Sequence, residues 1–179
     1  MYKVVVFDLD ETLGYFAELG IFWKTINNFI NFKKIKYNLS QEDFNDIMGL
    51  YPEFERPYII DILNYLKNKK IKNQCYKIII YTNNQGGKTW VEYIKKYFEN
   101  KINYNLFDEV LSAFIIGDIN EDSSRKSNIK TYKDLVKCTK LPFHSQIFFL
   151  DDVYHSKMAL YNVYYINIKP YIYLSLIHI

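Results

Sequence analysis

The stretch from Tyr2 to Leu9, YKVVVFDL, constrains the fold of this chain more than any other feature. Its apolar residues occupy consecutive rather than alternate positions, which is typical of a strand buried on both faces at the centre of a parallel sheet. Four further short apolar runs, separated by segments of helical period, are predicted strands: Tyr76–Tyr81, Glu109–Phe114, Gln146–Leu150 and Val163–Ile168. This alternation predicts an α/β domain with a central parallel sheet.

Length and composition narrow the possible classes of protein. A chain of 179 residues corresponds to one domain, so we expect residues 1–179 to share one core. The net charge of +3 is too balanced to favour nucleic acid as a partner. The aromatic content of 18% could reflect a binding surface, but the bias of an AT-rich coding sequence is the simpler explanation.

The cysteines and the ends of the chain bear on its location. Cys75 and Cys138 are the two cysteines, and neither lies in a CxxC pair, which indicates a reduced intracellular compartment. We expect no signal peptide and no membrane span, and therefore a soluble protein of the cytoplasm or nucleus. The last residues, Leu174–Ile179, stop within an apolar run that suggests a truncated or non-native end, and we assign them no function.

The segment Gly14–Glu55 separates the first strand from the next core helix, which is predicted to begin at Pro57. It is about forty residues long, whereas about 2–6 residues usually connect such elements. A helical period over Phe22–Ile35 and a capping box of Ser40 with Asp43 predict short helices within it. We interpret the segment as a small cap or flap over a site. The alternative is an ordinary helical insertion packed on the domain.

Carboxylates follow two of the predicted strands. Asp8, Asp10 and Glu11 end the first, and Asp151 and Asp152 end the fourth. Acids directly after a buried strand are costly unless they are paired or bind a cation. Ligands bind at the carboxyl ends of strands in open α/β sheets, so neighbouring strands would bring these groups together. Oxygen ligands without a Cys/His cluster favour Mg²⁺ as the cofactor.

The end of the second predicted strand carries groups suited to phosphate. Thr82 and Asn83 follow this strand, and Gly86-Gly87 precede a predicted helix. A hydroxyl, side-chain amides and helix N-terminal amides can form a phosphate cradle there. Lys88 is similar to the lysine of a P-loop, but that motif requires glycine at position 82, where this chain has threonine.

In order and spacing, these motifs resemble those of the haloacid dehalogenase (HAD) superfamily. The resemblance rests on DLDET at 8–12, Thr82, a lysine before the fourth strand, and Asp151-Asp152, and it covers roughly residues 2–168. It implies a Rossmann-like HAD core with a central parallel sheet and a small cap or flap insert after the first strand. It also implies a phosphatase, that is, a hydrolase of phosphoric monoesters.

Within that superfamily the chain looks most like the NLI-interacting-factor-like group of small C-terminal-domain phosphatases. The matching stretches are DLDETL at 8–13, Arg56-Pro57 before the first core helix, and Lys133-Asp134-Leu135, which begins 18 residues before Asp151. By this match Lys133 is the motif lysine, and Lys126 and Lys130 are the alternatives.

Three departures from that group bear on the substrate. TNNQGG at 82–87 is closer to the TNQ-G of polynucleotide 3′-phosphatases and histidinol-phosphate phosphatases. The fourth motif is Asp-Asp where the small phosphatases usually have Asp-Asn, and residues 14–55 have a helical period where those enzymes have short strands.

The resemblance implies a role for each motif residue. Asp8 would be the nucleophile that forms an aspartyl-phosphate, Asp10 the general acid and base, and Lys133 the cation that neutralises the phosphoryl group. Mg²⁺ would be held by Asp8, Asp10 through its carbonyl, Asp151 and Asp152. The predicted substrate-binding and phosphate-binding residues are Thr82, Asn83 and Thr12.

The expected function is therefore Mg²⁺-dependent hydrolysis of phosphoserine or phosphothreonine in proteins. A nucleic-acid 3′-phosphatase, a small-molecule phosphatase and a non-catalytic binding module are the alternatives. Four aromatic residues closely follow the loop that carries Asp8 and Asp10: Tyr15, Phe16, Phe22 and Trp23. We expect some of them to border an open groove rather than a sealed chamber.

Overall fold

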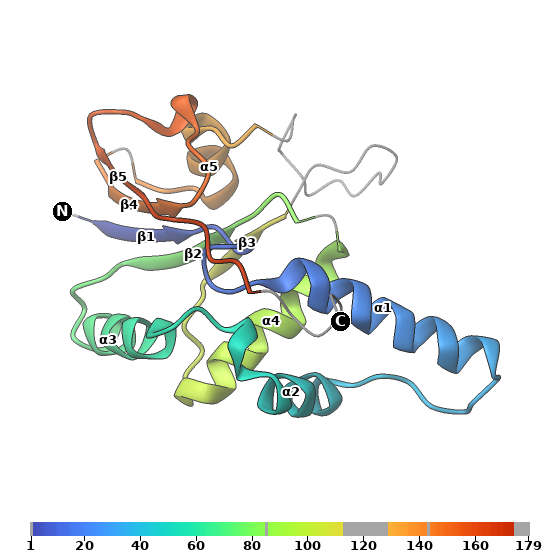
Figure 1. The fold of residues 1–179 in the computed structure, drawn as a ribbon. Helices are drawn as coiled ribbons and strands as arrows, with labels where there is room; N and C mark the ends of the chain where they lie inside the picture. Colours follow the sequence, from blue (N-terminus) through green and yellow to red (C-terminus); the bar gives the residue numbers. More distant parts are fainter. Residues whose placement is uncertain (1, 85, 113–128, 143, 174–179) are drawn as a thin grey trace.

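The computed structural model describes residues 2–84, 86–112, 129–142 and 144–173. Five strands form one sheet in the order β3-β2-β1-β4-β5, and every neighbouring pair is parallel (Figure 1). The strands are β1 (Lys3–Phe7), β2 (Lys77–Tyr81), β3 (Glu109–Leu111), β4 (Gln146–Asp151) and β5 (Val163–Asn167). The prediction of an α/β fold with a parallel sheet is confirmed.

The first strand occupies the predicted central place. Val5 of β1 lies in register with Ile78 of β2 on one side and with Phe148 of β4 on the other. Its apolar residues are buried, or half-buried in the case of Val5, because the sheet has helices on both faces, and this explains why the strand lacks the alternation of a half-exposed one. The third strand ends earlier than predicted, and residues 113 and 114 of that prediction lie outside the described residues.

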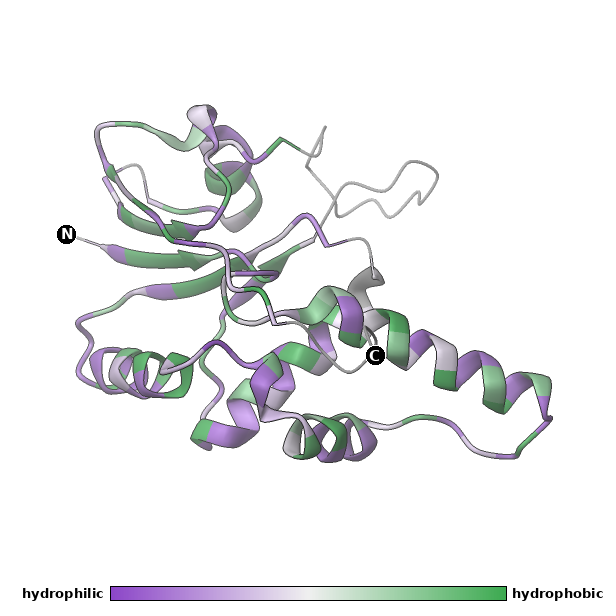
Figure 2. Ribbon diagram, viewed as in Figure 1, coloured by the Kyte–Doolittle hydropathy of each residue, from purple (hydrophilic) through white to green (hydrophobic). Residues whose placement is uncertain are grey.

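Two layers of helices enclose the sheet (Figure 1). One face packs against α3 (Ile59–Ile71) and α4 (Gly87–Ile102), and the other against α5 (Tyr132–Thr139). Figure 2 shows the apolar residues gathered along the strands and on the helix faces turned toward them. Trp90 on α4 is buried in the larger core cluster, as predicted.

The segment between β1 and α3 forms α1 (Phe16–Phe32), α2 (Gln41–Leu50) and the 3₁₀ turn η1 (Pro52–Phe54). The capping box of Ser40 is confirmed, since Asp43 exchanges hydrogen bonds with it in both directions. The structure differs from prediction at two helix starts. α1 begins six residues before Phe22, and α3 begins after Pro57 because Tyr58 is in the left-handed conformation with φ 65°.

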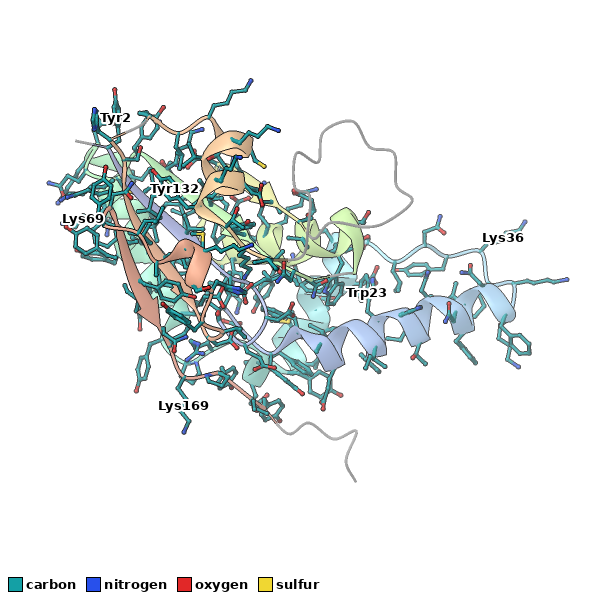
Figure 3. The ribbon with its side chains drawn as sticks, turned by 90° about the horizontal axis from the view of Figure 1, so that it is seen from above. Tyr2, Trp23, Lys36, Lys69, Tyr132 and Lys169 are labelled. Carbon is teal, nitrogen blue, oxygen red and sulfur yellow. The ribbon has the colours of Figure 1, made fainter. Side chains whose placement is uncertain are left out.

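These inserted helices belong partly to the core and partly to the surface. Phe16 and Leu19 at the start of α1 are buried, as is Phe44 of α2, which packs its ring against Trp90 and Tyr93 of α4. The far end of α1 extends away from the sheet toward Lys36 (Figure 3). In the part of the chain that the structure describes, a membrane-spanning helix is absent.

Candidate active site

The carboxylates predicted to converge do so at the carboxyl edge of the sheet. β1 and β4 are neighbours, so the residues that follow them meet at the same edge. Carboxylate oxygens of Asp8, Asp151 and Asp152 all lie within 4.8 Å of one another. This Asp cluster consists of Asp8, at the end of the central strand, and an Asp pair from the strand beside it.

Asp8 is held rigidly at the centre of this cluster. Its side chain is buried, its backbone N–H donates to Leu150 O at 2.9 Å, and its carboxylate accepts a hydrogen bond from the Lys130 ammonium group. Burial raises the pKa of Asp8 to about 7, an effect that Lys130 opposes and the negative charge of Asp151 reinforces. The group is therefore a carboxylate whose charge depends on its cation partners.

Lys130 is the lysine of the site. Its side chain is only 2% exposed, and its ammonium group also donates to Asp151 at 2.7 Å. Lys130 directly precedes Thr131, the N-cap of α5, and so lies at the edge of the sheet. Lys133, predicted for this position, is the second residue of α5 and is exposed to solvent. The structure therefore brings Lys130, one of the two alternatives, to Asp8 in place of Lys133; the other alternative, Lys126, lies outside the described residues.

The second pair of acids is held by the loop after β4. Burial alone would raise the pKa of Asp151, but hydrogen bonds from His155 and Lys130 bring its pKa below the usual value. The backbone N–H of Val153 also donates to the Asp151 carboxylate, at 2.9 Å. Asp152 is less buried, and its carboxylate accepts a hydrogen bond from the Thr12 hydroxyl at 3.2 Å. Thr12 therefore joins the turn after β1 to the Asp pair.

Asp10 lies on the other side of the turn, against the loop after β2. Asn84 Nδ2 donates to Asp10 Oδ2 at 2.7 Å, whereas among the described residues none donates to the buried Oδ1 of Asp10. Burial raises the pKa of Asp10, and the hydrogen bond from Asn84 opposes this. An acid whose pKa is raised and whose second carboxylate oxygen has no hydrogen-bond partner among the described residues is suited to proton transfer.

Asn84 was not predicted from the sequence, where Asn83 was chosen instead. The run TNNQGG was the available signal, but it contains two adjacent amides. The turn decides between them: the N–H of Asn84 donates to Thr82 Oγ1 at 2.9 Å, and Asn84 Oδ1 accepts from the Gly86 N–H at 2.7 Å. Gly86 is required here, because a Cβ would lie 2.6 Å from the Trp90 ring.

The predicted phosphate-binding residues lie beside this loop. Thr82 is fully buried, with its N–H bonded to Leu111 O at 2.9 Å, and Asn83 is half-buried next to it. α4 begins immediately after, at Gly87, so the amides of its first turn point toward the same edge of the sheet. The roles of Thr82 and Asn83 toward phosphate stay predictions.

The donor set of the cluster fits Mg²⁺. All the side-chain ligands are carboxylate oxygens, which a hard divalent cation prefers, and their spacing allows one ion to touch all three of Asp8, Asp151 and Asp152. Asp10 was predicted as a further ligand through its backbone carbonyl, and this stays a prediction; its carboxylate accepts a hydrogen bond from Asn84.

An open groove of about 430 Å³ leads away from Asn84 between α1 and α4. Of the four aromatic residues expected at its border, Phe16 and Trp23 line it, whereas Tyr15 and Phe22 are not among its described lining; Trp23 is labelled in Figure 3. The described residues that line the groove are Phe16, Ala17, Gly20, Ile21, Trp23, Lys24 and Asn27 from α1, and Asn84, Gly86, Thr89, Trp90 and Tyr93 from the loop and α4.

Comparisons with known proteins add little to this geometry. No family model and no curated protein matches the chain. One solved structure that it resembles is the "putative HAD-hydrolase YfnB from Bacillus subtilis bound to magnesium", at 12% identity and a TM-score of 0.37, over 83% of this chain and 77% of that one. Similarity at this level does not define a function, so the assignment depends on the residues of the site.

Proposed function

We propose that this chain is a Mg²⁺-dependent phosphomonoester hydrolase of the HAD type that works through an aspartyl-phosphate. One observation carries the proposal: Asp8 and Asp10 follow the central strand, and Asp8 meets both a buried lysine and the Asp pair of the adjacent strand. A structural ion pair alone would need one carboxylate and one lysine, and the additional acids are costly unless a cation joins them.

In the first step an Asp8 oxygen attacks the phosphorus atom, and the bond to the leaving oxygen breaks. Asp10, whose pKa is raised by burial, donates a proton to the leaving alkoxide. Lys130 stabilises the anion of Asp8 before the attack. In the second step Asp10 takes a proton from water, which attacks the phosphorus and releases phosphate, and the Asp8 carboxylate is restored.

Asp8, Asp151 and Asp152 would hold the metal, and Mg²⁺ would supply the positive charge that lets an anionic phosphate approach an anionic nucleophile. Thr12 orients Asp152 through its hydroxyl. Asn84 orients Asp10 in the same way from the opposite side. Thr82 and the amides at the start of α4 would donate hydrogen bonds to the phosphate oxygens.

The substrate we propose is a protein that carries phosphoserine or phosphothreonine, with the insert 14–55 acting as a flap beside the groove. An open groove admits a polymer, and its lining is mostly apolar. Lys24 is the one cation among the described lining residues, which favours a peptide over a polyphosphate chain. A nucleic-acid 3′-phosphatase is the second candidate, because TNNQGG precedes a groove whose aromatic side chains, Trp23 and Trp90, could stack on bases.

A phosphatase screen tests the proposal directly. It should compare phosphopeptides, a 3′-phosphorylated oligonucleotide and small phosphate esters, each with Mg²⁺ and with EDTA. We expect Mg²⁺-dependent release of phosphate, fastest from a phosphopeptide, and none from the Asp8→Asn variant. Binding of phosphopeptide without any turnover by the wild type would instead indicate a non-catalytic binding module.

A further inference from the structure

We propose that Arg56 is a positioning residue that holds the turn Asp10–Gly14 in its active shape through the main-chain carbonyls of that turn. The inference rests on the proposed function, because the turn carries Asp10. Arg56 lies at the far end of the insert, about forty residues after the turn in the chain, and Figure 1 shows the segment before α3 returning to the end of β1.

The contacts of Arg56 are concentrated on consecutive carbonyls. Its Nε donates to Thr12 O at 2.7 Å, one terminal guanidinium nitrogen donates to Glu11 O at 2.5 Å, and its backbone N–H donates to Leu13 O at 3.1 Å. The same guanidinium nitrogen also reaches Lys169 O, at 2.8 Å. One residue thus satisfies three successive carbonyls of the turn and joins them to the segment after β5.

The turn needs such support. Glu11 has φ 58°, a left-handed conformation that costs a residue with a side chain roughly 1 kcal/mol or more. Two N–H groups of the turn are satisfied locally, from Glu11 to Gly14 O at 2.7 Å and from Leu13 to Leu9 O, just before the turn, at 2.9 Å. The carbonyls of Glu11 and Thr12, in contrast, accept hydrogen bonds from the guanidinium group of Arg56, which therefore supplies partners that the turn itself does not.

The segment 169–173, which we call the C-terminal strap, secures the arginine from outside. The N–H of Tyr171 donates to Glu11 O at 2.9 Å, the same carbonyl that Arg56 binds. The ring of Tyr171 lies over the guanidinium group, with 5.5 Å between its centroid and the central guanidinium carbon, and its hydroxyl donates to Glu53 O at 2.7 Å. The strap therefore limits the positions that the arginine side chain can take.

The turn held in this way carries two groups of the site. Asp10 is turned to Asn84, and the Thr12 hydroxyl is turned to Asp152. Releasing the carbonyls of the turn would let both groups move without removing either. Loss of Arg56 should therefore weaken proton transfer by Asp10 more than the attack by Asp8, which is fixed by the strand and by Lys130.

The test compares Arg56→Ala and Arg56→Lys with wild type on p-nitrophenyl phosphate and on an alkyl phosphate. Misplacing a reacting group by about 1 Å costs about 100-fold, so we expect Arg56→Ala to lose about 100-fold in kcat on the alkyl ester. The loss on the nitrophenyl ester, whose leaving group needs no proton, should be much smaller. Lysine should not restore activity, because one ammonium group lacks the planar fork; added ethylguanidine should restore part of it to Arg56→Ala. Ile172→Ala, an exposed position in the strap, is the matched control.

Equal losses on both esters, or full activity of Arg56→Ala, would overturn the inference. Tyr171→Ala is the milder second variant should Arg56→Ala fail to fold. Its kcat should also fall more on the alkyl ester than on the nitrophenyl ester, but by a smaller factor. Hydrogen exchange provides a readout that does not require activity. The amides of Glu11 and Leu13 should exchange faster in Arg56→Ala, while that of Thr82 should not change. If the wild type has no phosphatase activity, the proposed function fails, but this exchange pattern still tests the support of the turn.

Discussion

Lys130 is ion-paired with Asp8 although 122 residues separate them in the chain, and the same ammonium group also donates to Asp151. The topology makes this possible, because β4 pairs directly with β1 and the start of α5 faces the edge they share. One buried cation thus balances the two most buried carboxylates of the site. The nucleophile that we propose is kept in place by charge as well as by the strand.

The first prediction concerns this ion pair. Lys130→Met leaves two buried carboxylates without their cation, and breaking a buried pair costs about 3–5 kcal/mol. We expect the metal-free variant to lose about that much free energy of unfolding at neutral pH and to lose turnover. Lys133→Met is the matched control, since Lys133 is a lysine three residues later that is exposed in the first turn of α5, and it should change stability by about 0.5 kcal/mol at most. Chemical denaturation measures the loss of stability, and p-nitrophenyl phosphate turnover measures the loss of activity. A larger loss in Lys133→Met than in Lys130→Met would contradict the placement of Lys130.

Much of the fold could be predicted from the sequence because its signals are local. Consecutive apolar residues in Tyr2–Leu9 and Tyr76–Tyr81 indicated strands buried on both faces, and both occupy the middle of the sheet. The carboxylates after the first and fourth strands also met as expected, since parallel neighbours end at the same edge. Helix starts were less predictable. Tyr58 adopts a left-handed conformation that its own residue type disfavours, and so α3 begins later than Pro57 suggests.

The parts of the site that sequence could not identify depend on tertiary placement. Lys130 and Lys133 are alike as residues, and what separates them is that α5 starts at Tyr132, which leaves one at the sheet edge and directs the other to solvent. Asn83 and Asn84 are adjacent, and only the closed turn turns the second toward Asp10. The resemblance drew attention to Arg56-Pro57, but the contacts of Arg56 could not be predicted, because its partners are main-chain carbonyls.

The second prediction is a pH dependence with a defined sign. The pKa of Asp8 is raised from 3.8 to about 7, so between these values the folded state holds a proton that the unfolded state has lost. This group therefore contributes stability at low pH, and the contribution is lost as pH rises through about 7. In EDTA, the Tm of Asp8→Asn should equal the wild-type Tm near pH 3.8. As the pH rises toward neutral, the Tm of the variant should exceed the wild-type Tm by an increasing amount. Asp61→Asn, an exposed carboxylate on α3, should show no such trend. A difference that shrinks with rising pH would contradict the prediction.

The third prediction concerns the metal. Activity on p-nitrophenyl phosphate should stop with EDTA and return with Mg²⁺, and Ca²⁺ should support little of it because its coordination is looser. Saturating Mg²⁺ should raise the Tm of wild type, since a ligand at about 100 times its Kd stabilises the folded state by about 2.7 kcal/mol. Asp151→Asn should lose this shift, whereas Asp61→Asn should keep it. Full activity in chelator would exclude the proposed metal chemistry.

The fourth prediction separates the two functions of the carboxylates. Asp10→Asn removes the proton donor, which is worth about 10²–10⁴-fold, and the loss should be greatest for alkyl phosphates. Asn84→Ala should act more mildly. Because the amide hydrogen bond opposes the raised pKa of Asp10, its loss should move the pKa seen in the pH profile of kcat/KM upward. Asn68→Ala, an exposed amide on α3, serves as the control. Losses that are equal for nitrophenyl and alkyl esters would argue against proton donation by Asp10.

The last prediction tests the groove with two glycines. Gly20 lines the groove on α1, and a Cβ there would lie 3.4 Å from Trp90, so a methyl group fits but a larger side chain fills the groove. Gly49, near the end of α2, has no atom within 4 Å of an added Cβ. Gly20→Leu and Gly49→Leu both gain helix propensity, so a difference between them reports on the groove alone. If a phosphopeptide lies there, Gly20→Leu should raise its KM about tenfold or more, equivalent to about 1.4 kcal/mol of binding.

For p-nitrophenyl phosphate the KM of Gly20→Leu should stay near the wild-type value, because that ester is too short to extend along α1. Gly49→Leu should leave the KM for the phosphopeptide and the KM for p-nitrophenyl phosphate unchanged. Shortening the exposed end of the insert, residues 31–38, should likewise affect the polymer more than the small ester, since the groove runs from Asn84 along α1 toward that end. Should small sugar or amino-alcohol phosphates exceed every polymer by about a hundredfold in kcat/KM, the insert would have to close over the site as a cap. The proposed groove would then be wrong, because a closed site excludes the polymer that an open one admits.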